Sequence, residues 1–204
     1  MTMREGAFLT TVTAMMVAVA WAADADFVSL FDGKSLAGWT AEHSDRFTVR
    51  DGVIFNDGGT GWLRSAKSYK DFEFQAEFRA LKKGADSGVF FRSSAECTPN
   101  APHWPAKGYQ LQLVDGDGNL QIFGHGTAPP KFDRKSTDLK TAMKGAGEWQ
   151  TLTLKVVGAR AEVSLNGKLI TVSDAIQPPE GFIGLQGENC QFEWRNLKIK
   201  GLAP

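Results

Sequence analysis

The sequence predicts an all-β protein built as one antiparallel β-sandwich or jelly roll. Apolar residues recur with a period of two over most of the chain, which is the spacing of strands with one buried face. Turn signals rich in Gly, Asn and Asp separate these short runs at fairly even intervals. No window carries a helical stripe, and 204 residues, 42% of them hydrophobic, suffice for one full core.

The period of two places the strands. Apolar and polar residues alternate strictly through Phe72–Arg79, and Leu152–Val156 repeats the pattern. The pair Asn166–Gly167 is a strong hairpin signal, because both central residues of a type I′ turn need positive φ. It joins the predicted strands Ala161–Leu165 and Lys168–Val172. The other predicted strands are, in chain order, Trp62–Ser65, Ser87–Arg92, Tyr109–Val114, Leu120–Phe123, Gly181–Gln186 and Gln191–Ile199.

Two segments without alternation are predicted to be long loops. Ala95–Pro105 holds three prolines, and Pro129–Gly147 is rich in Lys, Asp and Pro and is expected to contain no more than one irregular turn. Loops of this length on a compact sandwich are more often functional than idle.

The N-terminus has the pattern of a secretory signal peptide. Arg4 lies in a short polar start, the run Ala7–Ala20 is apolar, and Ala20–Ala22 supplies small residues where signal peptidase needs them. The sequence therefore predicts a signal peptide over residues 1–22, one domain over residues 23–204, and a periplasmic or secreted protein. The apolar run is short for a membrane span, so no membrane contact is expected after cleavage. An uncleaved anchor is the alternative, because an acidic residue weakens the positive start.

The charge balance limits the classes of binding partner, and the two cysteines allow one disulfide. Twenty-three basic and twenty-three acidic side chains cancel without a basic patch, so nucleic acid and anionic membranes are poor partners. Cys97 and Cys190 are the two cysteines. In an oxidising compartment they can form one disulfide, whose long loop would contribute about 4 kcal/mol. Two unrelated free thiols are the alternative, and the sequence leaves both open.

Long polar side chains mark two predicted strands. One stripe runs along the polar face of Phe72–Arg79, and Gln110 with Gln112 forms a second. Two adjacent strands of this kind would line a concave sugar-binding face. The alternative is a solvated outer sheet whose charges pair across strands. For Gln110 and Gln112 a functional role is favoured over a solvated outer sheet, because Gln has only modest strand propensity.

An ordered set of short motifs runs through the chain. The motifs are Phe27–Trp39, Val49–Val53, Asp71–Phe74, Phe78–Arg79, Asp86–Arg92, Gly108–Asp115, Gly147–Trp149, Leu165–Gly167, Ile183–Gln186 and Trp194–Ile199. In this order they resemble the 3-keto-disaccharide hydrolase family, a bacterial family with a concanavalin A-like fold. The resemblance covers essentially all of residues 23–204, and the ordered set is far more specific than any one motif.

The chain departs from the family pattern at several positions. Within Gly108–Asp115 it has Gln110 where the family commonly has Glu, and Gly187–Glu188 stands where Asp-His is usual. Gln150 replaces an Asn, and Phe123 replaces a frequent Tyr. An amide transfers no protons, so if that family Glu is an acid or base, this chain uses another group or only binds its ligand.

The resemblance implies a substrate whose glucosyl C3 hydroxyl has been oxidised to a ketone. The ketone acidifies the hydrogen on C2, so the glycosidic bond breaks by proton abstraction and loss of the leaving group. This chemistry needs a base near C2, donors for the enolate oxygen, and an acid or water for the leaving oxygen. It does not need the opposed carboxylates of ordinary glycoside hydrolysis, and the Glu-x-Asp-x-x-Glu strand of glucanases is absent.

Three residues are candidate catalytic groups. Glu188, just after Gln186, is the spare carboxylate if Gln110 has lost that role. His125, between two glycines, has a side chain whose ordinary pKa suits a base. Asp115 ends a predicted strand before a Gly-rich turn, and a turn-forming Asp is the alternative interpretation.

Five residues are candidate substrate contacts. Arg92 ends a strand where its guanidinium would hold an enolate oxygen, with a surface ion pair as the alternative. Gln110, Gln112 and Gln186 would hydrogen-bond sugar hydroxyls. Trp104 would stack on a sugar face, or would pin its own loop.

No cofactor is established by the sequence, although a divalent metal is not excluded. Asp115, Asp117 and Asn119 are spaced like the start of a calcium loop, but the Glu at its twelfth position is missing. A hairpin turn explains them better. Three functions stay open: an exported enzyme that cleaves 3-keto-glycosides, a lectin-like carbohydrate-binding module without turnover, and a structural sandwich that mediates protein contacts.

Overall fold

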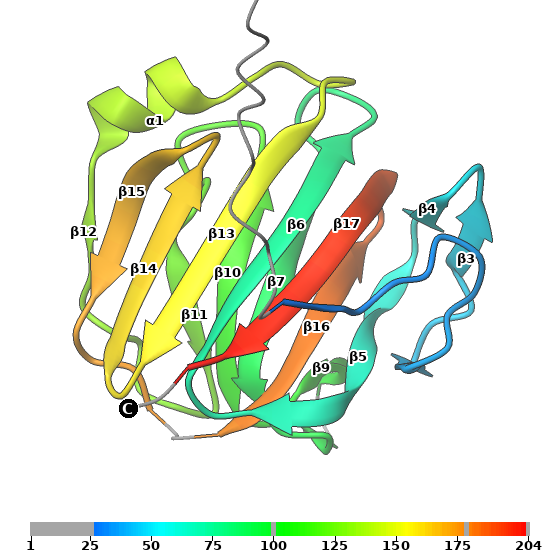
Figure 1. The fold of residues 1–204 in the computed structure, drawn as a ribbon, viewed down its shortest axis with the longest axis horizontal. Coiled ribbons are helices and arrows are strands. Elements are labelled where there is room, and N and C mark those ends of the chain that lie inside the picture. The colour runs from blue at the N-terminus through cyan, green and yellow to red at the C-terminus, as the bar shows by residue number, and fades with distance from the viewer. Residues whose placement is uncertain (1–26, 99–100, 178–179, 203–204) are drawn as a thin grey trace, which may run out of the picture.

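The computed structural model describes residues 27–98, 101–177 and 180–202, which form two sheets packed against each other (Figure 1). Among these residues, one sheet has nine strands and the other has six, with a separate two-stranded hairpin. Within each sheet and within the hairpin, the paired strands of the described residues run antiparallel. The predicted all-β antiparallel sandwich is confirmed.

Strands from distant parts of the chain pair within each sheet. The nine-stranded sheet pairs, in order, β12 (Asp133–Arg134), β15 (Lys168–Ser173), β14 (Arg160–Leu165), β13 (Gln150–Val157), β6 (Phe72–Ala80), β17 (Phe192–Gly201), β4 (Val53–Asn56) and β3 (Phe47–Arg50), with β1 (Val28–Ser29) beside β17. The six-stranded sheet pairs β11 (Ile122–His125), β10 (Gly108–Val114), β7 (Asp86–Ser93), β16 (Gly181–Glu188), β5 (Thr60–Tyr69) and β2 (Trp39–Glu42). The hairpin consists of β8 (Cys97–Thr98) and β9 (Ala101–Pro105).

The core lies between the two sheets. Along β6, buried residues alternate with half-buried ones, so Phe72, Phe74 and Phe78 face inward. On the six-stranded sheet, Leu111 and Leu185 belong to the same core cluster. Alternation along each strand therefore sends the neighbours of these residues to the outer face of their sheet.

The two predicted loops contain regular structure. Helix α1 (Ser136–Ala142) interrupts Pro129–Gly147, and its residues Leu139 and Ala142 are buried. Their spacing of three residues is the signal of a single buried helical face, but a helix of seven residues is too short to stand out as a stripe. Within Ala95–Pro105, β8 and β9 form a hairpin instead of an irregular loop.

Two expectations concern the termini and the thiols. The predicted signal peptide lies outside the described residues, and among the residues that are described no helix is long and apolar enough to cross a membrane. Cys97 and Cys190 are both free and half-buried, which agrees with the alternative of two separate thiols. Cys190 packs against the hydrophobic core.

Candidate functional site

The outer face of the six-stranded sheet collects most of the candidate residues. In the register of β10, β7 and β16, Leu111, Val89 and Leu185 lie opposite one another and face the core. The residues on either side of them, including Gln110 and Gln186, therefore point outward. Three central strands thus present their polar side chains on one shared surface.

These side chains form a continuous hydrogen-bonded line, which we call the amide chain: Gln112, Gln110 and Gln186. The Gln110 Nε2 group donates to Gln112 Oε1 at 2.6 Å and to Gln186 Oε1 at 3.0 Å. The outer amides each donate to a carboxylate, Gln112 to Asp86 at 2.5 Å and Gln186 to Glu188 at 2.7 Å.

His125 joins the amide chain at its centre. Its Nε2 atom lies 3.0 Å from Gln110 Oε1. His125 ends β11 at the edge of the sheet, while Glu188 ends β16 two strands beyond β10. The two candidate proton-transfer groups are therefore joined through two glutamine amides, those of Gln110 and Gln186.

Aromatic rings border the amide chain on the same face. Phe90 lies opposite Gln110 in the register, and its ring contacts those of Trp62, Trp104 and His125, with centroid distances of 5.3, 5.9 and 5.5 Å. Phe90 and Trp62 are fully buried although they do not belong to the core cluster. These outer aromatics give the polar line an apolar, partly dry border, and they place Trp104 of β9 next to it.

Burial shifts the pKa values of all three titratable groups of the site. Burial raises the pKa of Asp86, and burial together with the charge of Asp86 raises that of Glu188. Burial lowers the pKa of His125. The site therefore favours a neutral imidazole and a carboxyl group that keeps its proton to higher pH than usual, which are a proton acceptor and a proton donor.

Gly88 leaves the room that the amide chain needs. It lies opposite Gln112, and a Cβ atom there would stand 2.8 Å from Gln186 Oε1 and 2.9 Å from the Leu111 carbonyl oxygen. We expect Gly88→Ala to displace the Gln186 amide and to lower the free energy of unfolding by about 1–3 kcal/mol, the usual cost of overpacking.

Urea denaturation measures this loss, with Gly116→Ala as the matched control. A Cβ at Gly116 meets nothing within 4 Å, so this variant should unfold like the parent protein. Equal unfolding midpoints for the two variants would contradict the tight packing of amides over Gly88.

The structure does not bring Arg92 into this site. Its side chain is 1% exposed, and its guanidinium donates to the carbonyl oxygens of Lys70 and Gly158 and pairs with Asp71 at 3.2 Å. Arg92 borders an open pocket of about 710 Å³ whose lining includes no member of the amide chain. The alternative of a surface ion pair is wrong in that the Arg92–Asp71 pair is buried, and the guanidinium joins the β5–β6 and β13–β14 turns.

Asp115 also lies apart from the amide chain. Its carboxylate accepts a hydrogen bond from the Gly84 backbone, at 3.4 Å. Asn119 is buried, and its Oδ1 accepts from the Val114 backbone, which closes the turn after β10. The hairpin-turn interpretation of this segment is confirmed. Among the described residues, no three His, Cys, Asp or Glu side chains gather as a group that could hold a metal ion.

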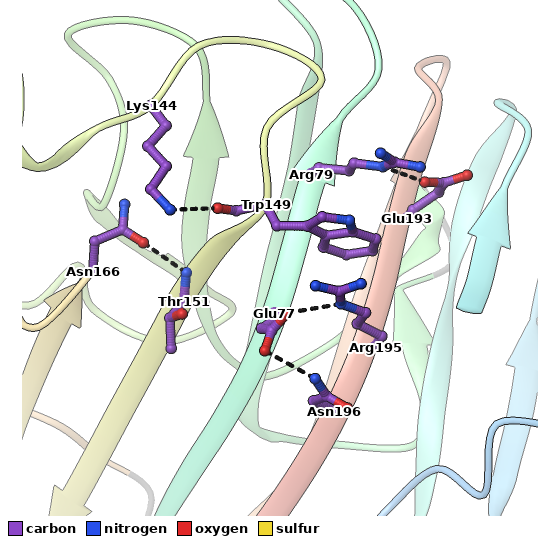
Figure 2. A network of polar contacts seen from close by, with 9 residues as sticks. All are labelled: Glu77, Arg79, Lys144, Trp149, Thr151, Asn166, Glu193, Arg195 and Asn196. Carbon is purple, nitrogen blue, oxygen red and sulfur yellow. Dashed lines mark hydrogen bonds and ion pairs between the residues drawn. The ribbon is translucent and has the colours of Figure 1, made fainter. Parts of the chain in front are cut away.

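The predicted polar stripe along Phe72–Arg79 belongs to the other sheet. β6 lies in the nine-stranded sheet, so its polar residues do not adjoin Gln110, and the idea of two adjacent strands is wrong. Figure 2 shows what they do: the Trp149 ring lies between Arg79 and Arg195, and Arg195 pairs with Glu77. This is the solvated outer sheet with cross-strand ion pairs, held by cation–π contacts.

Sequence reasoning missed two members of the site. Asp86 begins the Asp86–Arg92 motif, but only the register shows that it meets Gln112. Phe90 lies in a run of three apolar residues, Val89–Phe91, so its outward direction has no periodic signal. The Asp86–Arg92 motif was therefore the sequence signal that could have identified Asp86, and no sequence signal existed for the outward direction of Phe90.

Comparison with known proteins agrees with this architecture. A protein from Parabacteroides distasonis, provisionally described as a glycosyl hydrolase, superposes with a TM-score of 0.66 at 19% identity, over 88% of this chain and 95% of its own. The carbohydrate-binding module CBM66 from Bacillus subtilis superposes with a TM-score of 0.62 at 15% identity, over 80% and 96%. A β-glucanase from Bacillus licheniformis gives a TM-score of 0.51 at 10% identity, over 87% and 97%. At these identities the likeness concerns the fold alone.

Sequence comparison identifies the family. The 3-keto-disaccharide hydrolase of Bacteroides thetaiotaomicron is 38% identical over 82 residues, which cover 33% of this chain and 28% of that longer protein. The sequence model of the 3-keto-alpha-glucoside-1,2-lyase-like domain matches residues 26–200. Because this match spans almost the whole sandwich, the chain belongs to the 3-keto-alpha-glucoside-1,2-lyase-like domain family.

Proposed function

We propose that this protein cleaves the glycosidic bond of a 3-keto-glycoside on the outer face of its six-stranded sheet. The observation that carries the proposal is the hydrogen-bonded line from His125 through Gln110 and Gln186 to Glu188. It joins a candidate base to a candidate acid in a chain of this family, and partial burial of both groups sets their pKa values for these roles.

The proposed reaction is an elimination across C1 and C2 of the oxidised sugar. His125 takes the proton from C2, the electron pair forms the enolate of the C3 ketone, and the C1–O bond then breaks. Glu188 gives its proton to the leaving oxygen. The products are an unsaturated 3-keto sugar and the free alcohol, and addition of water to the new C1–C2 double bond completes a net hydrolysis.

The amides would stabilise the enolate and orient the sugar. Gln112 donates one N–H to Asp86 and is only half-buried, which leaves its second N–H for a sugar oxygen, while Gln186 is 2% exposed and donates to Glu188. Fixed donors aimed at a developing negative charge are among the largest contributors to catalysis. Trp104, next to Phe90, is placed to contact the apolar face of the sugar ring.

The pH dependence of kcat/KM should be bell-shaped. Burial lowers the pKa of His125 from its ordinary 6.5, so the imidazole stays neutral at pH values where a free histidine is already protonated. Activity should therefore fall on the acidic side only when the pH drops through this lowered pKa. The pKa of Glu188 is raised from its ordinary 4.5, so the acid is lost as the pH rises through this higher value. Glu188→Gln should therefore be slower and should lack the fall on the basic side.

The pH–rate profile of Glu188→Gln is to be compared with that of Glu162→Gln, a variant of the nine-stranded sheet whose glutamate pairs with Arg160. The control should keep the bell shape of the parent. A basic limb that persists unchanged in Glu188→Gln would remove Glu188 from the role of acid.

A carbohydrate-binding module without turnover is the second candidate. The specific observation in its favour is that the centre of the site is an amide, Gln110, which binds hydroxyl groups but transfers no proton. Trp104, which is half-buried and packs against Phe90 beside it, would serve a lectin as well as an enzyme.

Product release separates the two candidates. The purified protein is incubated with 3-keto-trehalose and a 3-keto-β-glucoside, each beside its unoxidised parent, and the freed sugar is followed by chromatography with and without a chelator. Release from the keto compounds alone is the expected result. Binding by calorimetry without release from any of them would favour the carbohydrate-binding module, and loss of release with chelator would add a metal to the mechanism.

We also propose that the protein is exported, because its first 22 residues have the composition of a signal peptide. N-terminal sequencing of the protein recovered from the periplasm or medium of a producing cell should begin at Ala23. A chain that begins at Met1 and stays with the cells would contradict this.

A further inference from the structure

The two carboxylates at the ends of the amide chain determine which way its amides point. An ionised carboxylate accepts hydrogen bonds and has none to donate. The NH₂ group of Gln112 must therefore face the Asp86 carboxylate, as it does at 2.5 Å, and that of Gln186 donates at 2.7 Å to a Glu188 oxygen, which accepts whether or not that carboxyl group carries its proton. Both outer amides consequently turn their oxygens toward the centre of the chain.

The orientation of the central amide, that of Gln110, is fixed by its two neighbours. Two oxygens face Gln110, and its NH₂ group donates one proton to each, at 2.6 Å to Gln112 and 3.0 Å to Gln186. Gln110 Oε1 is then directed away from both of them, toward His125 Nε2 at 3.0 Å. Because an amide oxygen only accepts, the hydrogen of this bond must come from the imidazole.

The direction of these hydrogen bonds also determines the tautomer of the His125 imidazole. A neutral histidine carries one N–H and one bare nitrogen, and the bond made by one nitrogen decides the state of the other. With Nε2–H committed to Gln110, the bare nitrogen is Nδ1. The Phe90 ring lies edge-on to the imidazole, at a centroid distance of 5.5 Å, and restricts its rotation.

We propose that Gln110 is a positioning residue that holds His125 as the Nε2–H tautomer, so that Nδ1 is the atom that takes the C2 proton. This inference rests on the proposed function for its catalytic meaning, while the tautomer itself is a property of the ligand-free protein. It also gives a reason for Gln at position 110: the amide accepts from His125 without a negative charge that would protonate the imidazole.

The tautomer is measured by NMR of the ¹⁵N-labelled full-length protein, with the His125 ring signals assigned from their loss in His125→Gln. At a pH where the ring is neutral, we expect a pyrrole-like Nε2 and a pyridine-like Nδ1. A pyrrole-like Nδ1, or a mixture of both tautomers, would overturn the proposal. This measurement is made on the parent protein, so it holds even if a variant of Gln110 fails to fold.

Gln110→Glu tests the second half of the inference. A carboxylate at hydrogen-bond distance from His125 should raise the pKa of the imidazole by about 1–3 units. Gln75→Glu is the matched control, because it makes the same substitution at a hydrogen-bonded glutamine of the nine-stranded sheet, where Gln75 donates to Glu73. It should leave the His125 titration unchanged. An unshifted His125 in folded Gln110→Glu would show that position 110 does not set the state of the ring.

These outcomes separate the inference from the proposed function. The Nε2–H tautomer in a protein that releases nothing from 3-keto-glycosides would uphold the positioning role of Gln110 and contradict the proposed reaction. The opposite tautomer in a protein that does release sugar would overturn the positioning role alone.

Discussion

Replacing His125 by glutamine is expected to lower kcat on a 3-keto-glucoside by about 10²–10⁴-fold, the usual contribution of a general base. Glutamine keeps a group that can hydrogen-bond to Gln110 but has no basic nitrogen for the C2 proton. The fold should persist, because His125 ends an edge strand and is only half-buried. Steady-state kinetics on a 3-keto-β-glucoside give the rate.

His43→Asn is the control for this substitution. His43 is exposed on the turn after β2, and its positive φ of 54° is one that asparagine tolerates. This variant should retain the parent kcat. A loss of less than tenfold in folded His125→Gln would assign proton abstraction to another group.

Replacing Asp71 by alanine is expected to lower the free energy of unfolding by about 3–5 kcal/mol, the usual cost of leaving one partner of a buried ion pair uncompensated. The Arg92 and Asp71 side chains are 1% and 4% exposed, and Asp71 also accepts from the Gly158 backbone at 2.7 Å. The substitution therefore leaves a buried guanidinium without its counter-charge and a turn without its hydrogen bond.

Urea denaturation of Asp71→Ala beside Asp174→Ala measures this difference. Asp174 pairs with Arg160 at 2.8 Å, and both side chains are largely exposed, so its loss should leave the unfolding midpoint close to that of the parent protein. Similar losses in the two variants would mean that the Arg92–Asp71 pair does not anchor the sandwich. The expected contrast would show that Arg92 stabilises the fold by joining two turns.

The sequence predicted those parts of the fold that have a period. The alternation along β6 and β13 and the Asn166–Gly167 turn identified real strands and a real hairpin, because burial of one sheet face imposes that period directly. Helix α1 and the β8–β9 hairpin were not predicted, since elements this short contain too few repeats of the apolar pattern. The pairing of strands from distant parts of the chain has no local signal, which is why β6 was placed beside β10.

The same reasoning explains which site residues were found. Gln110 and Gln112 stood out because glutamines are unusual in an apolar strand, and the family motifs pointed to Gln186 and Glu188. The hydrogen bonds that join them depend on strand register, which the sequence does not give. Arg92 looked equally suited to a ligand, because composition does not distinguish an exposed arginine from one buried by turns far away in the chain.

Transfer of the C2 hydrogen is the central step of the proposed reaction, and isotopic labelling tests it most directly. A 3-keto-β-glucoside with deuterium at C2 is compared with the unlabelled compound, with a protein-free sample to correct for spontaneous exchange beside the ketone. We predict that the label slows release of the leaving group several-fold and that the deuterium passes to water. Equal rates, with the deuterium retained in the sugar product, would show that the bond breaks at C1 without removal of the C2 proton and would contradict the account.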